Sequence, residues 1–387
     1  MIKMKIVQPL DYLKQIVQID TTNPPGNELP LAETLKNLLD SVGIPNTLLI
    51  HGENRANLIA ELVGNKNTDK VLGLSGHMDV VPIGDKVWKY PPFSAHEADG
   101  KLYGRGTSDM KGGLVALLYA MIQIKQENIS FSGKIKFLMT FGEEIGATGA
   151  KELVRLGHMD DVSALVIAEP TNNEIYTAEK GVLWLEVKTY GEIAHGSQPE
   201  SGVNAIEHMY YLLRGIQEEF KMDVQEDELL GKPTLNISLI DGGVNTNVVP
   251  DTCRLQIDIR TIPSQSHQDI ISELHKLFKT IQCKVPNLLY DMKIINELPS
   301  LKTPSSDSFV QFFQKEAEDF FKSERRLRGI PVYTDGAVLK KTDSTIPVVI
   351  FGPGDLSKAH ETNEHIEIGA FHRSISFFKQ IIKNYLK

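Results

Sequence analysis

The sequence predicts an α/β protein in which a mostly parallel sheet, covered by helices on both faces, is interrupted by an inserted α+β segment. Short apolar runs alternate with helical patterns in the first part of the chain, as in parallel sheets whose strands are joined by helices. From about Gly181 the residues alternate as in half-buried strands, and after about Glu297 the first rhythm resumes. We therefore expect a larger domain, formed by residues 1–180 and 297–387, and an inserted domain of residues 181–296.

In the larger domain, segments with the pattern of a buried strand alternate with segments that have helical spacing. Apolar runs of strand length occur at Ala56–Leu62, Val71–Leu74, Lys134–Thr140, Ala164–Ala168 and Val348–Phe351. Helical spacing occurs at Leu31–Val42, Gly113–Lys125, Ala147–Leu156, Ser306–Phe321 and Ala370–Leu386. The first of these helices is expected to end at Gly43, because glycine commonly follows the last helical residue.

The inserted domain follows a different order of elements. Strands are expected at Val182–Thr189, Leu235–Ile240, Arg254–Ile259 and Met292–Ile295, and helices at Asn204–Phe220 and Gln268–Ile281. The order β-α-β-β-α-β is that of a ferredoxin-like unit with an antiparallel sheet.

Composition narrows the classes of function. The chain has 387 residues, 41% of them hydrophobic, and a net charge of −9. An acidic balance argues against nucleic acid or an anionic membrane as partner, and no segment has the length of a membrane span. Cys253 and Cys283 are too few for a disulfide framework, and no signal-peptide pattern opens the sequence. We expect a cytoplasmic enzyme that acts on small molecules.

Potential metal ligands follow several of the predicted strands. His77 and Asp79 come after the run at Val71–Leu74, and others lie farther along the chain: Asp109, Glu143, Glu144, Glu169 and His360. In open α/β sheets, ligands bind beyond the carboxyl ends of the strands, so these side chains are expected to meet in one crevice. Imidazole nitrogens and carboxylate oxygens are ligands that suit Zn²⁺ and related ions.

The number of ligands predicts two metal ions. A single zinc ion needs fewer protein ligands, whereas a carboxylate that bridges two ions would use them all. Asp79 is expected to accept the ring N–H of His77. Glu143 and Glu144 cannot both face one way on a strand, so one carboxylate would bind metal and its neighbour would take a proton from water.

Two other catalytic motifs are incomplete. The segment Gly104–Asp109 begins like a dinucleotide-binding loop but lacks its last glycine. The segment Gly73–His77 has a histidine where the nucleophile elbow of serine hydrolases has a glycine. A serine hydrolase is therefore disfavoured.

The potential metal ligands and the segments around them resemble those of the dinuclear zinc amidohydrolases. This family includes succinyl-diaminopimelate desuccinylase, acetylornithine deacetylase, aminoacylase and several di- and carboxypeptidases. The resemblance runs almost from end to end. It rests on the stretches Thr22–Glu28, Ser75–Val80, Leu102–Gly113, Gly142–Glu144, Ala168–Thr171, Ala194–Ser197, Asn247–Pro250 and Phe351–Gly354.

This resemblance implies the role of each metal-site residue. It places one ion on His77, Asp109 and Glu169, and a second on Asp109, Glu144 and His360. It makes Glu143 the general base and Asp79 the partner of His77. The expected cofactors are two divalent ions, with Zn²⁺ first and Co²⁺ as the alternative. It also implies a cis peptide bond after Asp109.

Further roles fall in or near the inserted domain, which the resemblance makes a lid and dimerisation domain. His195 matches a histidine that polarises the scissile carbonyl, from its own subunit or from the partner of a homodimer. Residues expected to contact the substrate are Lys180, Asn247, Arg260, Gly352 and Gly354. Lys180 departs from the desuccinylase pattern, in which an arginine near this position helps to hold the succinyl carboxylate.

The expected reaction is metal-dependent hydrolysis of the amide bond in an N-acyl amino acid or dipeptide. N-succinyl-LL-2,6-diaminopimelate is the preferred substrate, in lysine biosynthesis. Acetylornithine is the alternative, as is a dipeptide cleaved by a dinuclear zinc di- or aminopeptidase. A binding protein without turnover is also considered, but such a chain would be expected to lose the base or a ligand, and here all are present.

Overall fold

The computed structural model describes residues 7–222, 225–340 and 345–387, and it forms two compact units. The larger unit comprises Met1–Thr177, Lys302–Gly329 and Thr334–Lys387. The smaller unit comprises Ala178–Leu301 and Ile330–Tyr333. A chain of this length can build two hydrophobic cores, and each unit has its own.

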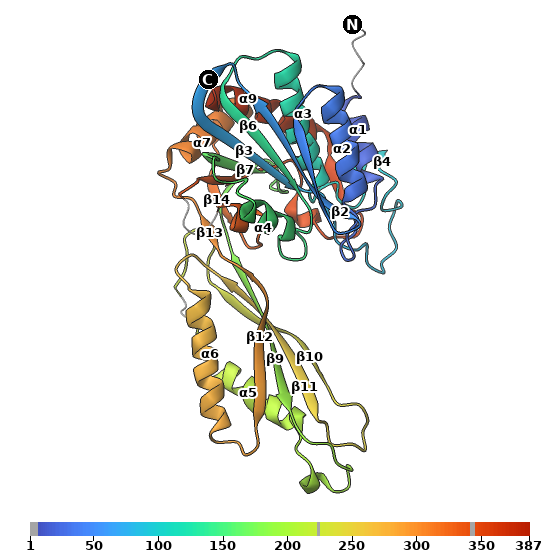
Figure 1. Cartoon of the computed structure of the whole chain (residues 1–387), viewed down its shortest axis with the longest axis vertical. Helices are drawn as coiled ribbons and strands as arrows, with labels where there is room; N and C mark the ends of the chain where they lie inside the picture. Colours follow the sequence, from blue (N-terminus) through green and yellow to red (C-terminus); the bar gives the residue numbers. More distant parts are fainter. Residues whose placement is uncertain (1–6, 223–224, 341–344) are drawn as a thin grey trace. The chain divides into compact units, whose positions relative to one another are not determined.

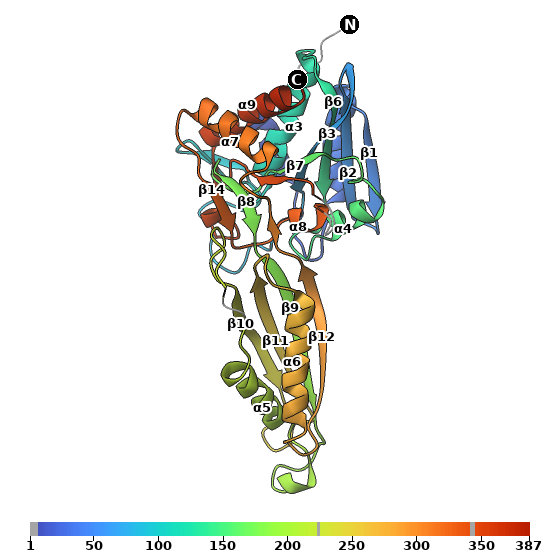
Figure 2. The same ribbon diagram turned by 90° about the vertical axis from the view of Figure 1, so that its left-hand side faces the viewer.

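The larger unit is built on a mixed sheet whose central strands are parallel (Figures 1 and 2). The strand order is β1-β2-β6-β3-β7-β15-β8-β13, and β14 pairs with β8. The pairs β6–β3, β3–β7 and β7–β15 are parallel, whereas the pairs toward the edges, β1–β2, β2–β6 and β15–β8, are antiparallel. The bounds are β1 Asn46–His51, β2 Arg55–Val63, β3 Lys66–His77, β6 Ser132–Thr140, β7 Ala164–Ile167, β8 Ile175–Glu179, β13 Leu301–Lys302, β14 Leu327–Ile330 and β15 Val348–Ile350.

Helices cover both faces of this sheet. They are α1 Pro9–Val17, α2 Leu29–Ser41, α3 Lys111–Gln126, α4 Thr148–Arg155, α7 Ser308–Phe321, α8 Gly336–Leu339 and α9 Ile368–Tyr385. In β6, alternate residues Ile135, Phe137 and Met139 join the apolar core that α1, α2, α3, α7 and α9 complete. The residues between them face the other way, where Lys136 donates to the carbonyl of His158, just after α4.

Several elements of the larger unit carry no strong sequence pattern. A small sheet, β16-β5-β4, consists of three-residue strands: β4 His96–Ala98, β5 Lys101–Tyr103 and β16 His365–Glu367. The single-turn helix η2 Leu356–Lys358 is equally short, as is η1 Pro199–Ser201 in the smaller unit. Segments of this length cannot show a period, so pattern analysis does not find them.

The smaller unit has the predicted β-α-β-β-α-β order. Its elements are β9 Gly181–Tyr190, α5 Ala205–Glu218, β10 Thr234–Gly242, β11 Thr252–Thr261, α6 His267–Gln282 and β12 Leu289–Leu298. The strands pair antiparallel in the order β10-β11-β9-β12. Alternate residues of β11, such as Leu255 and Ile257, are buried against α5 and α6. Asn204 and Ser266 cap these two helices with side-chain oxygens.

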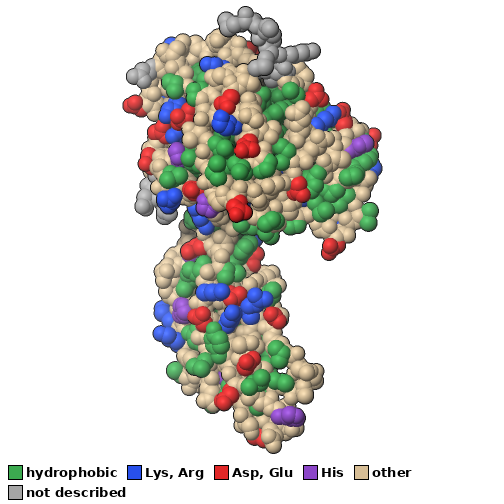
Figure 3. All heavy atoms as spheres, turned by 45° about the vertical axis from the view of Figure 1, so that its right-hand side comes forward, with side chains coloured by type: hydrophobic (Ala, Val, Ile, Leu, Met, Phe, Trp, Pro, Cys, Tyr) green, Lys and Arg blue, Asp and Glu red, His purple; other side chains and the backbone are tan. Residues whose placement is uncertain are grey.

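The surface and the cysteines complete the description of the chain. Acidic and basic side chains are intermixed on the face drawn in Figure 3, so the excess acid is not gathered in one area of that face. Cys253 and Cys283 are free thiols. Among the described residues, no helix is both long and apolar enough to cross a membrane.

Candidate metal centre

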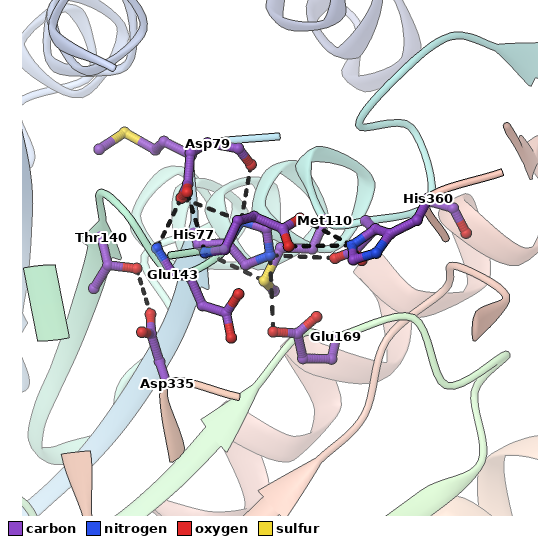
Figure 4. A network of polar contacts seen from close by, with 12 residues as sticks. His77, Asp79, Met110, Thr140, Glu143, Glu169, Asp335 and His360 are labelled. Carbon is purple, nitrogen blue, oxygen red and sulfur yellow. Dashed lines mark hydrogen bonds and ion pairs between the residues drawn. The ribbon is translucent and has the colours of Figure 1, made fainter. Parts of the chain in front are cut away.

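The ends of three parallel strands bring the predicted ligands together (Figure 4). His77 is the last residue of β3 and is paired in register with Thr140, the last residue of β6. Glu143 and Glu144 therefore begin their loop beside His77, and Glu169 leaves the neighbouring β7 two residues after its end. Each short loop follows a buried apolar strand, so the strands fix where the polar side chains emerge.

Two groups of ligand atoms share Asp109. The Nε2 atom of His77 lies 3.2 Å from Oδ1 of Asp109 and 3.9 Å from Oε1 of Glu169. The Nε2 atom of His360 lies 3.3 Å from the other oxygen of Asp109 and 3.1 Å from Oε2 of Glu144. In each group all ligand atoms lie within 4.8 Å of one another. The structure thus brings all five predicted ligands together, with Asp109 between the two groups.

His77 is held by the residue expected to orient it, but through a different atom. Its Nδ1 atom lies 2.9 Å from the backbone carbonyl oxygen of Asp79 and 3.6 Å from the Asp79 carboxylate. A carbonyl only accepts, so Nδ1 carries a proton, and Nε2, the atom that faces Asp109, is the one left to bind a metal ion. The expected contact with the carboxylate is thus replaced by one with the backbone, because β3 ends at His77 and the chain turns there.

The Asp79 carboxylate instead holds the loop that follows β6. It accepts hydrogen bonds from the backbone N–H groups of Glu143, at 3.1 Å, and Glu144, at 3.2 Å. The side-chain amide of Asn23 donates to the same carboxylate at 2.8 Å. Asp79 therefore ties the two adjacent glutamates to the end of β3.

A buried ion pair fixes Asp109 and His360, which are far apart in sequence. Glu364 accepts from the backbone N–H groups of Ser108 and Asp109, at 2.8 and 3.0 Å. Its other oxygen lies 2.6 Å from the guanidinium of Arg105, and that guanidinium donates to the carbonyl of His360 at 3.4 Å. The peptide bond between Asp109 and Met110 is cis. The sequence analysis assigned no role to Arg105 or Glu364.

The cluster contains more buried acid than its imidazoles neutralise. Burial alone would lower the pKa of His77, yet Asp109 and the neighbouring carboxylates raise it well above its ordinary value. Hydrogen bonds with Asp109 and Glu144 raise the pKa of His360 to about 10. Burial raises the pKa values of Glu143 and Glu169 well above the usual range, and neighbouring carboxylates add to the effect.

This donor set fits divalent metal ions. Two imidazole nitrogens and several carboxylate oxygens converge within ion-binding distance, and buried negative charge is stabilised by cations. His77 is already oriented with Nε2 toward the cluster and with Nδ1 held by a backbone carbonyl, as in metal-bound histidines. Two groups of three ligands with one shared aspartate have the arrangement of a two-metal site.

Asp335 is a further buried acid beside this cluster, and no pattern in the sequence pointed to it. It precedes the short helix α8 but does not cap that helix; its Oδ2 atom accepts a hydrogen bond from Thr140. Its Oδ1 atom is buried without a hydrogen-bond partner. Burial raises the pKa of Asp335 to about 6, against the opposing effects of Thr140 and His77.

The glycines predicted near the substrate pack against the backbone that carries the ligands. A Cβ atom on Gly352 would lie 2.4 Å from the carbonyl oxygen of Glu169. One on Gly354 would lie 2.2 Å from the carbonyl oxygen of Ser108. Only glycine allows these backbones to approach so closely. The two positions thus shape the site whether or not they also contact substrate.

The remaining predicted residues lie in the smaller unit. The ammonium group of Lys180 donates a hydrogen bond to the backbone carbonyl of Lys232. Arg260 forms an ion pair with Asp258, at 2.9 Å, and burial together with the charge of Arg260 lowers the pKa of Lys180. Asn247 lies beside the loop that carries His195: the backbone N–H of Gly196, the next residue, donates a hydrogen bond to the carbonyl of Asn247 at 2.7 Å.

Comparison with known proteins agrees with this geometry. The model of "Peptidase family M20/M25/M40" matches residues 73–384, which is well over half of the chain. The chain belongs to this peptidase family. It is therefore a metallohydrolase, and the resemblance inferred from the sequence motifs is confirmed.

Relatives of this M20 chain match it along its length. A probable succinyl-diaminopimelate desuccinylase of Staphylococcus aureus is 33% identical over 98% of both chains. An acetylornithine deacetylase of Buchnera aphidicola is 28% identical over 94% of both chains. The crystal structure of aminopeptidase PepT from Bacillus cereus covers 98% of both chains with a TM-score of 0.78 and 23% identity. This likeness of fold confirms the predicted fold class, including the antiparallel inserted sheet.

The buried ion pair gives a prediction for metal affinity. Glu364→Gln removes the charge that holds both Arg105 and the Asp109 backbone, so we expect metal affinity to fall about 10- to 100-fold. Competition with a chromogenic chelator measures this. Glu367→Gln is the matched control, because Glu367 lies on the surface beside Lys101. Equal affinity in the two variants would contradict the role given to Glu364.

Asp335 gives a prediction for the pH dependence of stability. Its raised pKa means that the folded protein retains a proton that the unfolded chain loses between pH 3.8 and about 6, so stability is lost as pH rises through this window. Asp335→Asn, which keeps an acceptor for Thr140, should raise the free energy of unfolding of chelator-treated protein by about 2–3 kcal/mol at pH 8 and by little at pH 4. Urea denaturation at both pH values measures the difference.

A second substitution at the same contact sharpens this test. Thr140→Val removes the donor and leaves the buried carboxylate without it, so it should destabilise the protein at pH 8. A stabilisation by Asp335→Asn that is equal at both pH values would refute the explanation by proton linkage.

Proposed function

We propose that the cluster holds two divalent metal ions, Zn²⁺ or Co²⁺. His77, Asp109 and Glu169 would hold one ion, and Asp109, Glu144 and His360 the other. The observation that carries this proposal is the convergence of two imidazoles and three carboxylates into two groups that share Asp109. When bound, such ions acidify water and polarise a carbonyl oxygen.

Within this site, Glu143 is proposed as the general base. Its carboxylate is buried and lies within 4.8 Å of ligand atoms of His77 and Glu144. The Asp79 carboxylate accepts a hydrogen bond from its backbone N–H. Glu143 would accept a proton from the attacking water and return it to the amine that leaves. A raised pKa, which burial and nearby carboxylates produce, suits a group that must both take and release a proton.

The proposed substrate is N-succinyl-LL-2,6-diaminopimelate. Support comes from the relatives that are 33% identical over nearly the whole chain and are named probable desuccinylases. A second support is chemical: Lys180 and Arg260 are cations in the smaller unit, and each would exchange its present partner, the Lys232 carbonyl or Asp258, for a carboxylate of the substrate. Acetylornithine has no carboxylate on its acyl group, and it is the substrate of the alternative.

Mutation of the two adjacent glutamates should have different effects. Glu143→Gln should retain bound metal and lose about 10²–10⁴-fold in kcat, because it removes the base but no ligand. Glu144→Gln should lose metal, because it removes a ligand beside His360. Metal analysis after gel filtration, together with steady-state kinetics, distinguishes them. Full activity in Glu143→Gln would refute the base.

A substrate panel tests the reaction. Metal-reconstituted protein should hydrolyse succinyl-diaminopimelate faster than acetylornithine or simple dipeptides. Lys180→Met should lower kcat/KM about 10- to 100-fold for the succinyl substrate, by loss of a charged contact, and leave acetylornithine nearly unchanged. Preference for acetylornithine, or an equal loss on both substrates, would favour the alternative.

We also propose that the chain forms a homodimer through the smaller unit. Strand β10 is an edge strand, and exposed apolar side chains gather near it: Ile206 and Tyr210 on α5, Ile240 on β10 and Val244 just beyond. Ile206 approaches the end of this strand at Gly243. Unpaired edges and exposed apolar groups are features of protein interfaces.

The proposed interface gives a prediction for assembly. Ile240→Lys should shift the protein from dimer to monomer in analytical ultracentrifugation, since it places a charge in the apolar contact. Leu289→Lys is the control, because Leu289 is equally exposed on the opposite edge strand, β12. A monomeric wild-type protein, or dissociation by the control alone, would exclude this surface.

A further inference from the structure

The ring of His195 is held by its own loop. The Nδ1 atom of His195 lies 2.7 Å from the hydroxyl oxygen of Ser197 and 3.1 Å from the backbone nitrogen of the same residue. Both contacts converge on one ring nitrogen, and the side chains of both residues are exposed. A turn that needed only its backbone would not direct a hydroxyl and an amide to the same ring atom.

The second contact decides which nitrogen carries the proton. A backbone N–H can only donate, so Nδ1 of His195 must accept and present its lone pair. A proton on Nδ1 would place two N–H groups against each other. The hydroxyl of Ser197, which donates or accepts according to its rotation, can then donate to the same lone pair. The proton of the neutral ring is therefore on Nε2.

The backbone beneath the ring is fixed as well. His195 forms a β-bridge with Val248, and the backbone of Val249 donates to Ala194 at 2.9 Å. A Cβ atom on Gly196 would lie 2.9 to 3.1 Å from backbone atoms of Asn247. The loop that carries His195 is thus paired with the segment that carries Asn247, and glycine at 196 permits the close approach.

We propose that Ser197 is a positioning residue that fixes His195 in the Nε2–H tautomer, so that His195 can donate this proton in a hydrogen bond to the carbonyl oxygen of the substrate. The inference rests on the proposed function, because it presupposes an amide substrate whose carbonyl oxygen gains negative charge. A donor oriented in advance stabilises such an oxygen without reorganising during the reaction. The correct tautomer is a requirement, because a bare Nε2 would repel the oxygen.

The tautomer can be observed directly in the full-length protein. Two-bond ¹H–¹⁵N correlation spectra of protein labelled at its 11 histidines distinguish a protonated from an unprotonated ring nitrogen, and His195→Gln identifies the signals of His195. We expect a protonated Nε2 and an unprotonated Nδ1 in the wild-type protein. Ser197→Ala keeps the backbone N–H but loses the hydroxyl that donates to the same lone pair, so the Nδ1–H form should become partly populated. Ser197→Thr should restore the wild-type spectrum. An Nδ1–H tautomer in the wild-type protein would overturn the proposal.

Kinetics supply the second readout. Ser197→Ala should lower kcat about three- to tenfold with little change in KM, the effect of one lost hydrogen bond, and Ser197→Thr should recover it. His195→Gln should lose about 10²–10³-fold, as when an oxyanion donor is removed. Ser201→Ala, in the same exposed loop, is the control and should match the wild type. Unchanged tautomer and kcat in Ser197→Ala would refute the positioning role.

The two readouts separate the inference from the proposed function. If no substrate in the panel is hydrolysed, the proposed function fails, while the tautomer spectrum still decides whether Ser197 fixes the ring of His195. If hydrolysis occurs but the spectrum shows no dependence on Ser197, the function stands and the inference fails.

Discussion

The concentration of buried acid at the carboxyl ends of the parallel strands is the constraint on which the site depends. Asp109, Glu143 and Glu169 are buried, and Glu144 lies with them. Burying a carboxylate without a counter-charge is costly, and the two imidazoles cannot balance this many acids. The shifted pKa values express that imbalance, since the histidines hold protons tightly and the glutamates resist losing theirs. Divalent cations would relieve the imbalance, and for this reason the donor set fits two of them.

The rest of the larger unit keeps these charges in place. Asp79 fastens the Glu143–Glu144 loop to the end of β3, and the pair of Arg105 and Glu364 fastens Asp109 to the loop that carries His360. Gly352 lets one backbone pass close to the carbonyl of Glu169. These contacts mean that metal ligands from separate parts of the sequence are positioned by hydrogen bonds of the backbone as well as by the strands. Positioning of this kind preserves the geometry of ligands that repel one another.

The parts of the fold and of the site that carry a periodic or chemical signature could be predicted from the sequence. The apolar strands that precede His77, Glu143 and Glu169 were visible, as was the β-α-β-β-α-β order of the smaller unit. Strand β8 was missed, because Ile175–Glu179 has only five residues, of mixed apolar and polar character, and shows no clear alternation. The first helix, α1, was likewise not predicted.

The supporting residues of the site were harder to foresee. Asp79 accepts the ring N–H of His77 through its backbone carbonyl rather than its carboxylate, because β3 ends at His77. Arg105, Glu364 and Asp335 act through contacts across 195 or more residues of sequence, which no local pattern reveals. Their partners become apparent only when the strands are brought together.

The most direct test of two cations in one cluster is anomalous diffraction from crystals of the zinc-reconstituted protein, recorded at the zinc edge. We expect two peaks per chain about 3.5–4 Å apart, with Asp109 between them, His77 and Glu169 at one peak, and Glu144 and His360 at the other. A single peak, or metal bound elsewhere on the chain, would contradict this expectation.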